Sequence, residues 1–224
     1  MSIEKSSNDE REQRILDAAA DLIAHYGYDK TTVSDIAREA GISKGAIYLH
    51  FDSKDTLFEA LLIRETQRYS LRWLQMLEDD KDGGTIGSMY KKILYALNES
   101  PFMSAMFKRD ARILGSYVRK PDNFFRRQQD QDGRFIFVKM MQDAGVIRKD
   151  IDARVISHIM DMLAYGLVTM EDVKNPDHMP ETDALLAGIG DILDRALTPP
   201  DANPDAGKAI VKQIIESAQT KSNQ

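Results

Sequence analysis

The chain has 224 residues, which is long enough for one large domain or two small ones. Apolar residues make up 42% and charged residues 29%, as in ordinary globular proteins, and no apolar run approaches the ~18 residues that a membrane span needs. Cysteine is absent, which excludes disulfides, thiolate metal sites and thiol nucleophiles. The N-terminal residues contain no apolar signal region, so we expect a cytoplasmic protein.

The charge balance argues against nucleic acid as a partner. The formal net charge is −6, and the first 55 residues carry 7 Lys and Arg against 11 Asp and Glu. Bulk charge of this sign does not favour a nucleic-acid binder. A DNA-binding function must therefore rest on individually placed residues, with the acidic ones turned away from the phosphates.

Apolar residues recur at helical spacing along most of the chain. Gly27 predicts a helix stop, Thr32 with Asp35 forms a capping-box pattern, and Ser43 is suited to an N-cap. Pro101 fits a first helical position. No segment shows a convincing period of two, so the predicted fold class is all-α. The predicted helices cover residues 10–26, 33–41, 44–50, 53–78, 100–118, 123–144, 152–170, 182–197 and, as one of two alternatives for the C-terminus, 206–218.

Residues 31–54, TTVSDIAREAGISKGAIYLHFDSK, contain two short helical patterns separated by Gly41, which is the form of a helix-turn-helix. Small side chains on the second pattern would let the helix backbone approach base edges in the major groove. A corner of an apolar core with solvated polar residues is the alternative. The residues suited to DNA contact are Ser43, Lys44, Gly45, Ala46, Tyr48 and His50, with Lys54 at the start of the next helix.

The order of residues is more specific than this geometry. The string ILDAAADLIAHYGYDKTTVSDIAREAGISKGAIYLHFDSKDTLFEALL resembles the tetracycline-repressor (TetR) family of transcription regulators over residues 10–62. The resemblance implies a three-helix DNA-binding head on a larger helical body that dimerises and holds a small-molecule pocket. The DNA-contacting positions that it implies are Thr32, Ser43, Lys44, Gly45, Tyr48, His50 and Lys54.

The resemblance also suggests a division of the chain. We expect an N-terminal arm and helix-turn-helix domain over residues 1–53 and a ligand-binding and dimerisation domain over 54–198. Residues 199–224 would form a C-terminal tail, either loose or with an extra helix.

Two apolar helices are predicted over residues 152–170 and 182–197. From their residues alone they are either buried core helices or a subunit interface. The resemblance implies that these helices from two subunits form a four-helix dimer interface. The interface candidates are Val155, Ile159, Leu185, Gly188, Ile189 and Ile192.

Residues 102–170 are rich in methionine and aromatic side chains. Methionine fills irregular gaps and suits adaptable binding surfaces, although ordinary core packing explains most of these residues. The candidate pocket residues for an apolar or aromatic effector are Met106, Phe107, His158 and Tyr165.

Two smaller patterns each allow two interpretations. His158 and Asp161 are three residues apart, which suits a metal pair or, more simply, a satisfied or solvated histidine. Arg126 and Arg127 either lie on an exposed helix face or pair with an anionic ligand.

No Gly-rich phosphate loop, nucleophile elbow or HExxH motif is present, so we expect no enzyme, no metal and no cofactor. The favoured hypothesis is a repressor that binds a palindromic double-stranded DNA operator as a homodimer and is released by a small molecule. An activator or a protein-regulated DNA-binding protein of the same fold is one alternative. A helical enzyme or scaffold with an incidental motif is the other.

Overall fold

The computed structural model describes residues 2–80, 83–129 and 132–222. The chain forms two compact units. Unit 1 comprises residues 1–66 and 101–130, and unit 2 comprises residues 67–100 and 131–224. The predicted domain boundaries after residues 53 and 198 stay predictions.

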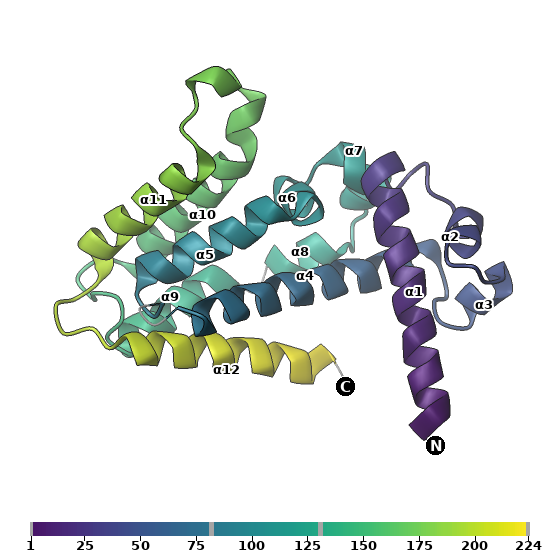
Figure 1. Cartoon of the computed structure of the whole chain (residues 1–224), viewed down its shortest axis with the longest axis horizontal. Helices are drawn as coiled ribbons and strands as arrows, with labels where there is room; N and C mark the ends of the chain where they lie inside the picture. Colours follow the sequence, from purple (N-terminus) through teal and green to yellow (C-terminus); the bar gives the residue numbers. More distant parts are fainter. Residues whose placement is uncertain (1, 81–82, 130–131, 223–224) are drawn as a thin grey trace. The chain divides into compact units, whose positions relative to one another are not determined.

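The predicted all-α fold is confirmed, because every regular element in the described ranges is helical (Figure 1). Three short 3₁₀ helices, η1 to η3, cover Gly115–Arg119, Met170–Asp172 and Pro176–His178. The α-helices are α1 (Ser2–Tyr26), α2 (Val33–Glu39), α3 (Lys44–Tyr48), α4 (Lys54–Glu78), α5 (Ile86–Glu99), α6 (Pro101–Lys108), α7 (Ala111–Leu114), α8 (Phe124–Gln129), α9 (Gly133–Asp143), α10 (Ala153–Thr169), α11 (Thr182–Leu197) and α12 (Pro204–Ser222).

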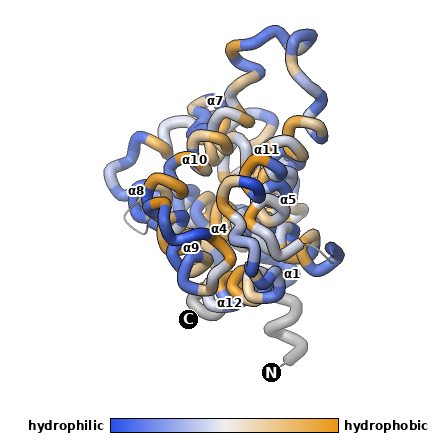
Figure 2. Tube along the Cα trace, turned by 90° about the vertical axis from the view of Figure 1, so that its left-hand side faces the viewer, coloured by the Kyte–Doolittle hydropathy of each residue, from blue (hydrophilic) through white to orange (hydrophobic). Residues whose placement is uncertain are grey.

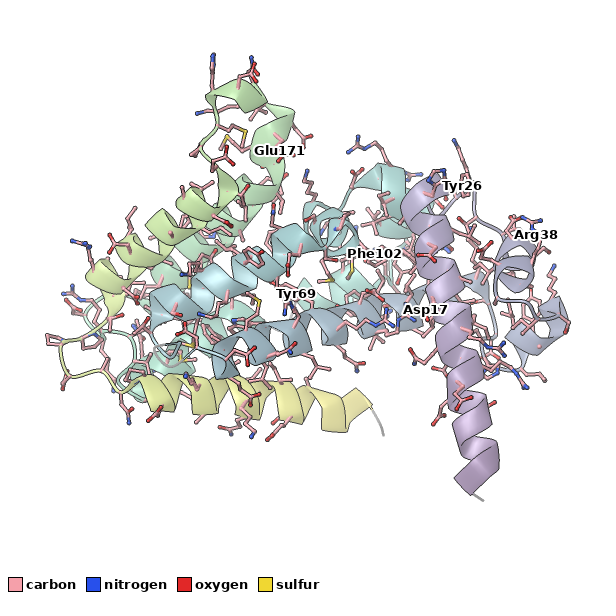
Figure 3. All side chains as sticks on the ribbon, viewed as in Figure 1. Asp17, Tyr26, Arg38, Tyr69, Phe102 and Glu171 are labelled. Atoms are coloured by element: carbon pink, nitrogen blue, oxygen red, sulfur yellow. The ribbon has the colours of Figure 1, made fainter. Side chains whose placement is uncertain are left out.

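A buried arginine joins α1 to α4 within unit 1. The Arg64 side chain is 8% exposed and pairs with Asp17 at 2.8 Å, while its guanidinium also donates to the carbonyl of Leu16 at 3.1 Å. Figure 3 labels Asp17 on α1. A buried guanidinium needs such partners, because an unpaired buried charge is costly. This cluster fixes the long N-terminal helix against the start of α4.

The helix α5 was not predicted from the sequence. It lies within unit 2 and packs against α11. Thr85 caps it by accepting a hydrogen bond from the amide of Ser88 at 3.2 Å. The carboxylate of Asp194 on α11 accepts from the Thr85 hydroxyl at 2.8 Å and from the Gly87 amide at 2.7 Å. The backbones of α5 and α11 approach closely, because a Cβ on Gly87 would lie 2.1 Å from the carbonyl oxygen of Gly190.

The single helix predicted over residues 100–118 is wrong. The helix α6 ends at Lys108, and Asp110 then caps the short α7 by accepting from the amide of Arg112 at 2.8 Å. At Gly115 the backbone turns with φ +56°, and a Cβ there would lie 2.7 Å from the Asp29 carboxylate. The predicted helix therefore breaks first at Arg109, where φ is +53°, and again at Gly115, which lies close to Asp29.

The helix predicted over residues 123–144 is two helices, α8 and α9. Its residues 130 and 131 lie outside the described part of the chain. Asp132 has the left-handed φ of +42°, which does not continue a right-handed helix, and α9 begins directly after it. Gly145 has φ +74° beyond the end of α9, as the sequence predicts.

The C-terminal stretch is helical and packs into unit 2. Val211 and Ile215 of α12 are buried. A Cβ on Gly207 would lie 2.3 Å from the carbonyl oxygen of Gly84, so the start of α12 lies directly against the turn before α5.

Figure 2 shows hydrophobic and hydrophilic residues alternating along α10 and α11, as in amphipathic helices that bury one side.

Candidate nucleic-acid interface

The predicted capping box at the start of α2 is confirmed. The Thr32 hydroxyl oxygen accepts from the Asp35 amide at 3.2 Å, and the Asp35 carboxylate accepts from the Thr32 amide at 3.2 Å and from its hydroxyl at 2.6 Å. The hydrogen bonds from Thr32, first from its hydroxyl and then from its amide, hold the pKa of Asp35 below its ordinary value. A phosphate contact by the Thr32 hydroxyl would have to replace its bond to Asp35.

A tight turn and an apolar contact place α3 against α2. Gly41 has φ +65°, a left-handed conformation that favours glycine, and the Ile42 amide donates to the carbonyl of Ala37 at 3.0 Å. Ile36 and Ile47 are almost completely buried between the helices. The two short helices therefore form the predicted helix-turn-helix geometry.

The opposite side of α3 faces outward. Ser43 caps the helix by accepting from the amide of Ala46 at 3.1 Å. Lys44, Gly45 and Tyr48 are exposed, and Ala46 is half-buried. A Cβ on Gly45 would meet no atom closer than the Ser43 hydroxyl oxygen at 3.8 Å, so open space adjoins the helix backbone there.

Leu49 lies on the same side and was missed in the sequence analysis. It is 84% exposed, the largest exposed fraction among the large hydrophobic residues described. An apolar side chain in the major groove can contact the thymine methyl group. The pattern contained the signal, because Ile47 and Phe51 both point inward and the residue midway between them on a short helix points away.

Two of the predicted DNA-contacting residues, His50 and Lys54, make contacts within unit 1 in this structure. The His50 side chain is 4% exposed, with its Nδ1 4.0 Å from a carboxylate oxygen of Glu12. The Lys54 ammonium donates to the carbonyl oxygen of Tyr28 and lies 4.0 Å from the centre of the Tyr28 ring. Burial lowers the pKa of Lys54 despite the nearby Asp29 and Asp55 carboxylates. Both side chains are therefore held by partners within unit 1.

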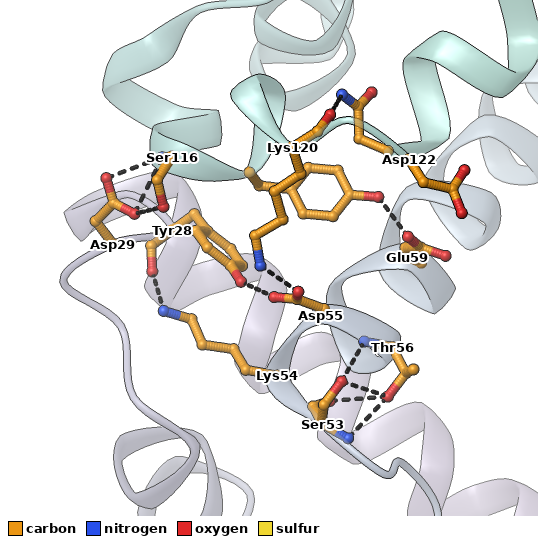
Figure 4. A network of polar contacts seen from close by, with 12 residues as sticks. Tyr28, Asp29, Ser53, Lys54, Asp55, Thr56, Glu59, Ser116, Lys120 and Asp122 are labelled. Carbon is orange, nitrogen blue, oxygen red and sulfur yellow. Dashed lines mark hydrogen bonds and ion pairs between the residues drawn. The ribbon is translucent and has the colours of Figure 1, made fainter.

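A polar network within unit 1, shown in Figure 4, connects Ser116 and Lys120 to the segment before α2 and to the start of α4. Asp55 accepts hydrogen bonds from the Tyr28 hydroxyl and from the Lys120 ammonium. Burial, followed by the bond to Asp55, raises the pKa of Tyr28 well above its ordinary value, so its hydroxyl stays a proton donor. The Asp29 carboxylate accepts from the Ser116 amide at 2.9 Å. No local sequence pattern indicated these pairings, because the partners lie far apart along the chain.

A second cluster extends this network along α4. The Tyr117 hydroxyl donates to Glu59 at 2.7 Å and accepts from the Phe124 amide at 3.0 Å. Arg127 pairs with the same Glu59 at 2.8 Å and with Asp122 at 3.2 Å. The two interpretations given for the arginine pair did not include this arrangement, in which the Arg127 guanidinium is paired with Glu59 and Asp122 within the chain.

The four candidate pocket residues are divided equally between the two units, and a pocket formed by all four stays a prediction. Met106 and Phe107 belong to α6 in unit 1, whereas His158 and Tyr165 lie on α10 in unit 2 and are both exposed. Asp161, the candidate metal partner of His158, instead accepts a hydrogen bond from Arg134 at 2.7 Å. Within the described part of the chain, no group of three His, Asp or Glu side chains is placed to hold a metal ion.

A cavity of about 640 Å³ lies inside unit 2, within the ~300–1,000 Å³ range of pockets for drug-sized ligands. Its wall comes from α4, α5, α9, α10 and α12 and includes Trp73, Tyr90, Phe137, Met140 and Met160. The last three belong to the methionine-rich and aromatic segment that the sequence analysis singled out. The contribution of α5 and α12 was not foreseen.

The predicted interface residues lie on an apolar stripe of α10 and α11. Val155 is 51%, Ile159 45% and Ile192 66% exposed, while Gly188 is exposed and Leu185 and Ile189 are half-buried. Met162 and Tyr165 extend the stripe along α10. An exposed apolar patch of this kind marks an interaction surface more often than a solvated one.

Comparison with known proteins identifies the class of this chain. Residues 15–61, which contain the helix-turn-helix, match the family described as "Bacterial regulatory proteins, tetR family". The chain belongs to the TetR family. It is a DNA-binding transcriptional regulator and not an enzyme.

The TetR-family similarity extends beyond the head. Over 163 residues the chain is 28% identical to the HTH-type transcriptional repressor Rv1474c of Mycobacterium tuberculosis, covering 70% of this chain and 80% of that protein.

Two solved structures show the same fold. FadR from Bacillus subtilis, in complex with stearoyl-CoA, has a TM-score of 0.59 at 19% identity, covering 81% of this chain and 96% of that one. NalD, the secondary repressor of the MexAB-OprM multidrug efflux pump in Pseudomonas aeruginosa, has a TM-score of 0.57 at 17% identity, covering 87% of this chain and 99% of that one.

None of the helices in the described ranges is long and apolar enough to cross a membrane.

Proposed function

We propose that this TetR-family regulator is a repressor that binds a palindromic DNA operator as a homodimer and releases it when a small molecule enters the body. The outward face of α3 is the observation that carries the proposal. Its Lys44 and Tyr48 are exposed, Gly45 leaves space beside the backbone, and Leu49 adds an apolar contact. A lysine and a tyrosine hydroxyl suit phosphates, and a slender helix suits the major groove.

Thr32 and Ser43 would contact the phosphates through the ends of α2 and α3, and Ala46 would pack beside the bases. His50 and Lys54 have a different role in this proposal. Both side chains are held inside unit 1, so they position α3 and the start of α4 and leave the phosphates to Lys44 and Tyr48.

The homodimer is supported by the exposed apolar stripe on α10 and α11. Release by a small molecule is supported by the cavity in unit 2 and by the relatives. Rv1474c and NalD are named as repressors, and FadR was solved with stearoyl-CoA bound. A cavity among the body helices gives an effector a place to bind apart from the DNA.

The proposal is tested by fluorescence anisotropy with labelled DNA from the region upstream of the protein's own gene. The wild-type protein should bind this DNA more tightly than a scrambled duplex. Lys44→Ala should weaken binding to both DNAs and reduce the slope of log affinity against log salt by about 1. Lys149→Ala, which removes an exposed charge of unit 2, is the matched control and should change neither value. Equal affinity and equal salt slope in all three proteins would contradict this docking of α3.

A further inference from the structure

The wall of the unit 2 cavity is largely apolar, and two of its polar groups are already used by the protein. Trp73 donates its indole N–H to the carbonyl of Met89 at 2.9 Å. The Tyr90 hydroxyl donates to the carbonyl of Met160. Burial raises the pKa of Tyr90 to about 12, so this hydroxyl keeps its proton. A ligand therefore meets the faces of these rings and gains no donor from either.

Arg134 is the charged side chain among the described residues that line this cavity. It sits in the first turn of α9, its side chain is 22% exposed, and its guanidinium carbon lies 5.8 Å from the centre of the Tyr90 ring. Its Nε donates to Asp161 of α10 at 2.7 Å. A guanidinium has five N–H donors in a planar fork, and this bond uses one of them. The other polar lining side chains, Gln213 and Ser217 of α12, are neutral and exposed.

We infer that the effector of this cavity is an amphipathic anion, with an apolar chain or ring system in the aromatic part and one carboxylate-like group on Arg134. An arginine binds a carboxylate through two parallel hydrogen bonds, and such charge-assisted bonds are about twice as strong as neutral ones. A neutral apolar ligand would bury the same apolar wall of the cavity but offer no acceptor to the remaining N–H donors of Arg134. The inference rests on the proposed function, because it names the class of the small molecule that the repressor senses.

The pairing with Asp161 connects this site to the predicted dimer face. Asp161 lies on α10, the helix that carries Val155 and Ile159, and its side chain is 51% exposed. An anionic ligand uses donors of Arg134 that the bond to Asp161 leaves over, and the Asp161 carboxylate repels its charge. Binding therefore weakens a link between α9 and α10. A ligand that binds better when the Arg134–Asp161 bond is broken shifts the protein toward α10 conformations without that bond. Because two copies are expected to meet at α10, such a shift would reach the dimer interface.

The chain's single tryptophan, Trp73, lines the cavity and reports its occupancy without any DNA. The probes are decanoate and decan-1-ol, which share one apolar chain and differ in the charged head group. We expect decanoate to change the Trp73 fluorescence with a dissociation constant at least about tenfold lower than that of decan-1-ol, the difference that a hydrogen bond to a charged group supplies. The same titrations are carried out on three variants.

Arg134→Gln should weaken decanoate binding by about tenfold and leave decan-1-ol unchanged within twofold, while Asp161→Asn should strengthen decanoate binding. Lys139→Gln, which removes an exposed charge from the same helix, should change neither. Circular dichroism checks that each variant is folded. Equal binding of both probes, or decanoate binding that ignores both Arg134→Gln and Asp161→Asn, would overturn the anionic class. Absence of any fluorescence change with both probes would overturn it as well. Failure of the repressor proposal appears separately, as loss of DNA binding in the anisotropy assay.

Discussion

At the scale of single residues, Asp55 joins three segments of unit 1, because Tyr28 and Lys120 both donate to it from distant parts of the sequence. Asp55→Asn should lower the free energy of unfolding by about 1–2 kcal/mol, the value of a lost ion pair and a weakened hydrogen bond. Urea denaturation measures this difference. The control is Asp150→Asn, whose partner Arg148 lies beside it on the exposed surface, and it should cost clearly less stability than Asp55→Asn. Equal losses in the two variants would contradict a structural role for Asp55.

The same carboxylate gives a pH dependence with a definite sign. Burial alone would raise the pKa of Asp55, but the hydrogen bonds from Lys120 and Tyr28 outweigh it and hold the pKa below its ordinary value. A depressed folded-state pKa contributes stability above the unfolded value of about 3.9, and this contribution disappears as the pH falls through the folded-state value. The stability difference between wild type and Asp55→Asn should therefore be full near pH 7 and shrink below about pH 4. A difference that grows on acidification would contradict this sign.

Substitutions of two glycines distinguish the cost of a left-handed backbone conformation from the cost of steric crowding. Gly27 and Gly41 both have positive φ, +80° and +65°. A Cβ on Gly27 would lie 2.3 Å from the carbonyl oxygen of Arg112, whereas a Cβ on Gly41 would meet nothing within 4 Å. Gly41→Ala should cost about 1–2 kcal/mol of stability for the left-handed conformation alone, and Gly27→Ala should cost clearly more. Thermal denaturation ranks the two variants, and a smaller loss for Gly27→Ala would show that residues 101–130 do not pack against this turn.

At the scale of elements, local signals predicted the head well. The caps at Thr32 and Ser43 and the stop at Gly27 lie where the sequence places them, because each depends on residues within one helical turn. The helix α5 could have been predicted too, since Thr85 is a capping residue and apolar residues follow it at helical spacing.

Other features of the elements were not available from local patterns. The interruption at Gly115 depends on Asp29 of the head, and the position of α12 depends on a glycine contact with Gly84. The helix-turn-helix pattern in the sequence identifies the candidate DNA-binding residues. It does not predict that His50 and Lys54 turn inward, because their partners Glu12 and Tyr28 lie far away in the sequence. Long-range contacts of this sort decide which side of a short helix a polar residue occupies.

The stripe on α10 and α11 gives a prediction for the dimer. Ile192 is 66% exposed, so Ile192→Asp should leave the folded subunit intact. In a dimer it would bury a carboxylate without a partner and weaken association by about 3 kcal/mol or more. Sedimentation velocity should show a dimer for the wild type and a folded monomer for the variant. Leu71→Asp, an exposed position on α4, is the control and should stay dimeric. A wild type that sediments as a monomer at micromolar concentration would contradict the predicted interface.

At the scale of the whole molecule, a dimer with two α3 helices must meet DNA at two symmetric places. Recognition helices of such dimers reach half-sites about 34 Å apart, one turn of DNA, or a multiple of that distance. The net charge of −6 makes general attraction to DNA weak, so binding depends on these two faces acting together. In the proposed dimer, an effector that alters the distance between the two α3 helices prevents simultaneous contact with both half-sites.

Hydroxyl-radical footprinting on the upstream DNA tests this account most directly. We predict two protected patches of equal strength on one face of the duplex, related by two-fold symmetry and centred about one helical turn or a multiple of it apart. Both should weaken together in Lys44→Ala and disappear together in the monomeric Ile192→Asp variant. A single asymmetric patch, or protection that survives in both variants, would contradict a homodimer that reads its operator with two α3 helices.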